Sequence, residues 1–420
     1  MPTNKGGQKP MLSLLDHVGP ELPFTLLLLA VLGLRARVTP RTRIWINVAP
    51  EKLWNLLRVY DGKFEDWGGF TVRSELIDPA TKTYRKIFSV VSGSGATRQS
   101  QALFRISDEV AEKRLELTRA DLQNKSESNE LLKLSYELLP EKSGTRLKTT
   151  YHWGKRSLLA QLLARTDLWG GAFRMKAYAE TGKPSGSAYI TLSIAVGVLT
   201  GLISVAAFEI MFGLAFALLL VLALFVHEFG HLLAYRLMGQ PWGRMIFLPF
   251  LGAIAMPRLP LESQAQSVFA ALMGPGFSAL LALACMVPIS LNDTHYPIIA
   301  LLGMVTAGLN IFNMLPAEPL DGGVALRSVL SRVIGQRANY GLMAVGALIC
   351  ILGLWMDQVV LIIFGGLAIL ANLKPRKIDH GLAPLTTLGL SISAFGYVAI
   401  VAAHISLLRF FSEAILALQS

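Results

Sequence analysis

Two histidines and a glutamate stand close together inside an apolar stretch of this 420-residue sequence. They form the run His227-Glu-Phe-Gly-His231, near the end of an apolar segment over about residues 211–238. Residues four apart share one face of a helix, so both imidazoles can bind one Zn²⁺ ion. Glu228 is placed to act on a water molecule at the metal rather than as a ligand. Ionisable residues inside a membrane helix indicate a functional site, and we prefer that interpretation to histidines that only hydrogen-bond within a bundle.

A zinc enzyme needs a third protein ligand and one position left open for water. Asp321 stands out, because acidic residues are scarce in this half of the chain. It lies in the run Asn313-Met-Leu-Pro-Ala-Glu-Pro-Leu-Asp321-Gly-Gly, just past a later apolar segment. Prolines and glycines break a helix there, which a membrane tolerates only where protein or a water-filled cavity satisfies the backbone. The other histidines are poorer candidates by position: His17, His152, His295, His380 and His404.

The composition separates a charged part from an apolar part. Residues 35–183 carry 44 of the 67 Lys, Arg, Asp and Glu residues, whereas residues 184–420 carry 19. The apolar runs of the second part reach membrane-spanning length.

The composition also excludes several classes of protein. Two cysteines are too few for a disulfide scaffold, and 53% hydrophobic residues exclude general disorder. The net charge of +11 comes from scattered basic residues without a nucleic-acid-binding motif, so we expect no nucleic-acid partner.

The charged part has the pattern of a small α+β domain. Strands are expected at 43–48, 83–91, 100–107, 113–120, 131–140 and 145–153, a short helix at 49–57, and a long helix at 155–180. This order, with INVAPEKLWNLL at its start, resembles the START-like, polyketide-cyclase-like helix-grip fold over residues 42–180. The resemblance implies a lipid-like ligand in an apolar cavity; a sensing or scaffolding module with a filled core is the alternative.

Seven apolar segments follow a Gly- and Ser-rich linker at 181–187. They cover about residues 188–208, 211–238, 266–290, 297–316, 340–356, 358–373 and 384–408. If the first segment leaves the cytoplasm, nine of the ten basic residues of this half lie on the cytoplasmic side, and Arg409 is the exception. The same orientation makes the charged domain cytoplasmic. Leu22–Leu34 is apolar but short for a span, and we interpret it as an N-terminal anchor or interfacial helix.

HEFGH together with NMLPAEPLDGG resembles the site-2 protease family of intramembrane zinc metalloproteases. The resemblance implies that His227, His231 and Asp321 bind zinc, that Glu228 is the general base, and that Asn313 helps to hold the substrate carbonyl or the oxyanion. It further implies a substrate-binding edge strand around Phe250-Leu-Gly252-Ala and a Gly-Pro helix start in Met273-Gly-Pro275-Gly-Phe-Ser278. Ser278 and Glu318 depart from the family pattern, where Asn and an apolar residue are usual.

We therefore expect an α-helical polytopic membrane protein with about six or seven core transmembrane helices and an α+β helix-grip soluble N-terminal domain. The expected parts are an N-terminal segment (1–41), the START-like domain (42–180), the linker (181–187), the protease core (188–373) and a C-terminal transmembrane segment (374–420).

The expected activity is zinc-dependent cleavage, by Glu-assisted attack of zinc-bound water, of a transmembrane segment in a single-span protein such as an anti-sigma factor or anchored regulator. The alternatives are a lipid-binding or transport protein and a catalytically silent scaffold, each with a structural zinc site. The expected location is the bacterial inner membrane. The sequence does not indicate the oligomeric state.

Overall fold

The computed structural model describes most of the chain and separates it into two compact units. The first unit ends at Leu192 and the second begins at Ser193, inside helix α5 (Gly186–Phe212). The described residues are 35–37, 39–66, 71–91, 97–121, 131–141, 143–183, 186–240, 242–250, 252–258, 261–290, 297–373 and 382–417. Leu22–Leu34, part of the linker, His295 and His380 lie outside them.

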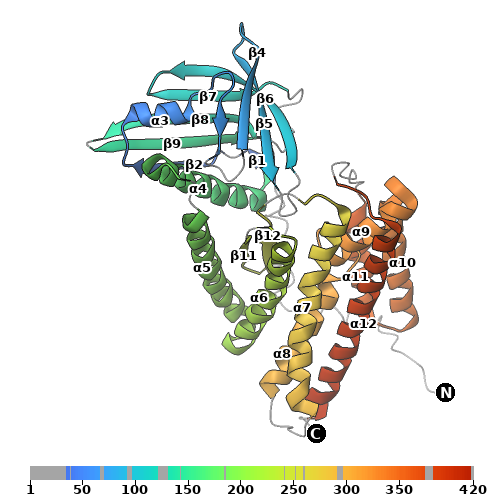
Figure 1. Cartoon of the computed structure of the whole chain (residues 1–420). Helices are drawn as coiled ribbons and strands as arrows, with labels where there is room; N and C mark the ends of the chain where they lie inside the picture. The colour runs from blue at the N-terminus through green and yellow to red at the C-terminus, as the bar shows by residue number, and fades with distance from the viewer. Residues whose placement is uncertain are drawn as a thin grey trace, which may run out of the picture. The chain divides into compact units, whose positions relative to one another are not determined.

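The first unit is built on one antiparallel sheet with the strand order β2-β9-β8-β7-β6-β5-β4-β3 (Figure 1). Its strands are β2 (Arg41–Ile46), β3 (Phe64–Glu65), β4 (Thr71–Asp78), β5 (Thr83–Val91), β6 (Thr97–Val110), β7 (Arg114–Arg119), β8 (Leu131–Glu141) and β9 (Gly144–Trp153). A separate pair joins β1 (Arg35–Arg37) to β10 (Lys155–Ser157). The six expected strands are present. β3 and β4 are additional, so the expectation missed one edge of the sheet.

Alternating side chains give this sheet a buried face. On β2, Ile44 and Ile46 are buried while the residues between them are exposed. The short helix α3 (Pro50–Leu57) begins with a proline at its first turn, where a missing N–H costs little. The long helix α4 (Leu158–Thr181) buries Ala172 and Met175 in the same apolar core. An antiparallel sheet with a long C-terminal helix is the α+β arrangement expected from the sequence.

The second unit is helical, and each of the seven expected apolar segments corresponds to a helix. Its helices are α5, α6 (Leu214–Leu237), α7 (Gln264–Ser290), α8 (Pro297–Asn313), α9 (Asp321–Ile334), α10 (Ala338–Trp355), α11 (Val359–Asn372) and α12 (Thr387–Ala417). Among the described residues, five helical stretches are long and apolar enough to cross a membrane, whereas α8 and α11 are shorter. A polytopic helical membrane protein is therefore the fold class.

Helix α9 differs from the expectation of a polar loop between spans. Arg327 and Arg332, which follow the fourth apolar segment, lie on α9, and Arg337 lies on a 3₁₀ turn (Gly335–Arg337) that leads into α10. Gly322, Gly323, Ala325, Ser328 and Val329 form the buried face of α9. The helix is amphipathic, which a count of charges alone does not reveal.

Candidate metal centre

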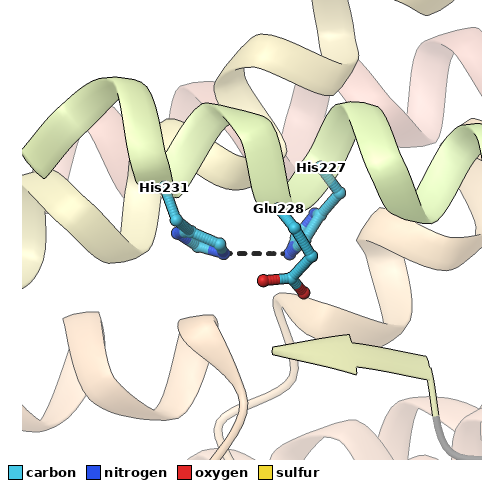
Figure 2. Close-up of side chains that lie close together, drawn as sticks. All are labelled: His227, Glu228 and His231. Atoms are coloured by element: carbon cyan, nitrogen blue, oxygen red, sulfur yellow. Dashed lines mark hydrogen bonds between the residues drawn. The ribbon is translucent and has the colours of Figure 1, made fainter. Parts of the chain in front are cut away.

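Helix α6 presents three ionisable side chains on one side. His227, Glu228 and His231 are all buried, and their ligand atoms lie within 4.8 Å of one another. The two imidazole Nε2 atoms are 3.1 Å apart, and the Glu228 carboxylate lies on the same side of the helix (Figure 2). The four-residue spacing on a helix brings the two rings together, as the sequence pattern predicted.

Asp321, the first residue of α9, completes a three-atom cluster. Its Oδ2 atom lies 3.0 Å from His227 Nε2 and 3.3 Å from His231 Nε2. Ligand atoms at two corners of a tetrahedron around Zn²⁺, with bonds of about 2.0 Å, are about 3.3 Å apart. The spacing of the three atoms therefore fits a tetrahedral zinc site with one position left over.

The Nδ1 atoms of His227 and His231 show which tautomer the two rings adopt. Their hydrogen bonds place the proton on Nδ1 and leave the Nε2 lone pair available for a metal. His227 Nδ1 lies 2.7 Å from the Asn310 side-chain oxygen, and His231 Nδ1 lies 2.7 Å from the backbone carbonyl of Ala270. The Asn310 amide nitrogen donates to the carbonyl of Thr306 at 2.8 Å, which orients the amide oxygen toward His227. Both Nδ1–H groups therefore donate outward, and the Nε2 lone pairs face the Asp321 carboxylate. Three electron-pair donors that converge in this way favour a bound cation.

Asn310 is a site residue that the sequence analysis missed. It is fully buried on α8, one turn before Asn313. A polar residue inside an apolar membrane helix is the signal that would have drawn attention to it. Asn313 is the last residue of α8 and is half-buried. Within the described part of the chain, its side chain makes no hydrogen bond to the histidines, Glu228 or Asp321, so the structure does not bring the fifth expected residue into this cluster.

Helix α7 lies tightly against the cluster. A Cβ atom added to Gly274 would overlap His231 Nε2 and would lie 3.1 Å from His227 Cε1. A Cβ atom on Gly230 of α6 would in turn overlap the carbonyl oxygen of Met273. The expectation of a helix start at the Gly-Pro motif is wrong: α7 begins at Gln264 and continues through Pro275. The glycines instead let α6 and α7 approach at the level of the histidines.

The loop before Asp321 is held by three other helices. Tyr397 of α12 donates to the Met314 carbonyl at 2.8 Å, and the Asn372 amide of α11 donates to the Pro316 carbonyl at 2.8 Å. Glu318, the departure from the family pattern, forms an ion pair with Arg327 of α9 at 2.9 Å. The Glu318 carboxylate is therefore engaged within the loop and its helix.

A two-stranded hairpin lies beside Glu228. Strands β11 (Arg244–Leu248) and β12 (Gly252–Met256) pair in antiparallel register. The backbone N–H of Ala255 on β12 hydrogen-bonds to the Glu228 carboxylate. The expected edge-strand region falls partly on this hairpin: Phe250 lies in the turn at positive φ, and the strand begins at Gly252. β12 has no strand partner on its second edge among the described residues.

Comparisons with known proteins agree on the membrane half. Residues 215–295 and 288–353 match Peptidase family M50. Zinc metalloprotease MJ0392 of Methanocaldococcus jannaschii is 29% identical over 150 residues, which is 35% of this chain and 43% of that protein. A second curated relative, from Synechocystis sp., is 34% identical over 134 residues, 31% of this chain and 35% of its own length. The chain thus matches less than half the length of either relative.

Solved structures resemble both halves at low overall similarity. The site-2 protease from Methanocaldococcus jannaschii has a TM-score of 0.30 and 22% identity, and the match covers 43% of this chain and 88% of that one. The Aha1 dimer from Colwellia psychrerythraea has a TM-score of 0.23 and 14% identity, and the match covers 35% of this chain and 98% of that one.

Proposed function

We propose that the chain, whose residues 215–295 and 288–353 match Peptidase family M50, is an intramembrane zinc metalloendopeptidase. The observation that carries the proposal is the convergence of His227 Nε2, His231 Nε2 and Asp321 Oδ2 within 3.3 Å of one another, beside the buried Glu228. In this proposal His227, His231 and Asp321 hold Zn²⁺. When bound, Zn²⁺ supplies Lewis-acid activation of water.

The residues of this chain supply the remaining chemistry. Glu228 accepts a proton from the attacking water and returns it to the leaving amine, with its carboxylate oriented by the Ala255 N–H. Asn313 holds the substrate carbonyl and the developing oxyanion. The free edge of β12 takes up an unwound substrate segment by strand addition, which satisfies the substrate backbone and exposes the scissile bond.

We propose a single-span membrane protein as the substrate, such as an anti-sigma factor or an anchored regulator. The site lies on helices of membrane-spanning length, so a peptide bond that reaches it must come from within or beside the bilayer. The proposed location is the bacterial inner membrane. The distribution of basic residues supports an orientation with the N-terminal domain in the cytoplasm.

Two alternatives remain distinct from this proposal: a lipid-binding or transport protein with a structural zinc site, and a catalytically silent scaffold. A structural site fills all four zinc positions with protein ligands and has no use for a buried carboxylate beside them. The presence of Glu228, oriented toward the cluster but not needed as a ligand, favours an enzyme.

The test compares Glu228→Gln with Asp321→Ala in purified full-length protein. Glu228→Gln should retain zinc by mass spectrometry and lose peptide cleavage about 10²- to 10⁴-fold, the usual contribution of a general base. Asp321→Ala should lose zinc and cleavage together. Full cleavage by Glu228→Gln would exclude the proposed mechanism, and full zinc with full cleavage in Asp321→Ala would exclude the ligand set.

A further inference from the structure

Both ends of helix α4 lead directly to apolar segments of the chain. β1 follows the apolar residues 22–34 and pairs with β10, in the register Arg35↔Ser157 and Arg37↔Lys155. β10 continues into α4 at Leu158, so the pairing holds Arg35 next to the start of that helix. At its other end α4 stops at Thr181, and α5 with its membrane-spanning stretch Ser193–Phe212 follows. The two connections are separated by a 24-residue helix, which is about 36 Å long.

The outward stripe of α4 carries aromatic side chains. Arg165, Trp169 and Phe173 follow one another at four-residue spacing and are exposed. Trp169 is 42% exposed and Phe173 is 36% exposed, and their ring centroids are 6.0 Å apart. Neither ring belongs to the cluster of buried residues that includes Ala172 and Met175. Tryptophan and phenylalanine on an exposed helix face beside basic residues are typical of helices that lie in a membrane interface.

Basic residues continue from this stripe onto the neighbouring edge strand. β2 exposes Arg41, Arg43 and Trp45 on its outward face, and neither arginine makes an ion pair with a described residue. Lys176 of α4 joins the two elements, because its Nζ donates to the Trp45 carbonyl at 2.8 Å and lies 5.1 Å from the centre of the Trp45 ring. Residues 35–50 contain four arginines and no acidic residue, so the charge of this region complements an anionic surface.

We propose that the outward stripe of α4 and the exposed basic face of β2 bind the surface of a bilayer that contains anionic phospholipids, so that α4 lies along the membrane plane. The membrane-spanning stretch that begins at Ser193 follows α4 after a short linker, which gives the surface a high effective concentration of membrane. Each Lys or Arg near an anionic leaflet contributes about a fivefold change in the binding equilibrium. The proposal does not depend on the proteolytic activity.

The experiment uses the full-length chain with Cys285→Ser and Cys350→Ser, reconstituted in nanodiscs. Trp169→Cys is labelled with bimane, and Phe173→Cys serves as a second probe of the same stripe. Ala111→Cys, in the exposed turn between β6 and β7, is the matched control. Two quenchers are used: lipids with brominated chains, which report contact with the bilayer, and aqueous iodide, which reports contact with water. Each is measured in nanodiscs of phosphatidylcholine alone and in nanodiscs of phosphatidylcholine mixed with phosphatidylglycerol.

In the anionic mixture, lipid quenching at positions 169 and 173 should be several-fold stronger than at 111, and Arg41→Gln with Arg43→Gln should reduce it. Iodide access at 169 equal to that at 111 would overturn the proposal. Shielding from both quenchers would also overturn it, because the stripe would then contact protein. Equal lipid quenching in phosphatidylcholine alone would overturn the assignment to anionic lipid.

Discussion

His227 depends on a neutral side chain for its orientation, because its Nδ1 donates to the Asn310 amide oxygen at 2.7 Å. Replacing Asn310 with Ala should weaken zinc binding about 10- to 100-fold, since the ring loses the partner that fixes its tautomer. Asn310→Asp keeps an acceptor and should restore most of the affinity. Competition with a chelator measures the affinity, and the absorption spectrum of the Co²⁺-substituted protein reports the ligand geometry.

Asn313→Ala is the control for that prediction, because Asn313 makes no hydrogen bond to the histidines in the described chain. This variant should keep the zinc affinity of the parent protein. An unchanged Co²⁺ spectrum and zinc affinity in Asn310→Ala would show that Asn310 only fills space.

The local His-Glu-His spacing was enough to predict the α6 residues, because a helix fixes that geometry. Asn310 could not be assigned in the same way, because its contact with His227 depends on how α6 and α8 pack.

At the scale of elements, the approach of α7 to α6 sets the space at the metal centre. Gly274→Ala should reduce zinc affinity about 10- to 100-fold, because the added methyl group overlaps His231 Nε2 and overpacking costs about 1–3 kcal/mol. Gly276→Ala is the matched control, since its Cβ would meet only Ile400 Cδ1 at 3.7 Å. Both changes raise intrinsic helix propensity equally, so the two variants should have the same helix content by circular dichroism. Equal zinc affinity in the two variants would contradict the packing argument.

The order of elements was largely predictable, whereas their exact starts and edges were not. The long apolar runs predicted the helices well, because a membrane span needs about 20 apolar residues. The apolar segment predicted over 266–290 matches α7, whereas the helix start that the resemblance implied at the Gly-Pro motif is absent, because the helix continues through Pro275. His404 of α12 donates to the Pro275 carbonyl at 2.9 Å and so links α12 to this part of α7. β4 was missed because Thr71–Asp78 mixes buried and half-exposed positions rather than alternating strictly.

At the scale of the whole molecule, the distribution of basic residues predicts a topology. Arg332 on α9 and Lys142, which follows β8 in the sequence, should face the cytoplasm, and Asp293, which lies between α7 and α8 in the sequence, should face the opposite side. Single cysteines at these positions, in intact cells, measure this with an impermeant thiol reagent. We expect labelling at 293 only; labelling at 142 and 332 with protection at 293 would reverse the topology.

The N-terminal unit is expected to control access of the substrate rather than the chemistry. All five proposed site residues lie after position 226, and each unit has its own cluster of buried apolar residues. A truncation that begins near Ser185 should therefore keep zinc and cleave a short unstructured peptide at close to the full rate. Cleavage of a membrane-embedded substrate should change several-fold in rate or selectivity, because the tethered domain is absent from the truncated protein.

Zinc content and monodispersity establish that the truncated protein is folded. Loss of peptide cleavage in such a preparation would place the domain within the catalytic machinery, whereas unchanged cleavage of both substrates would make it a passive folding or localisation module.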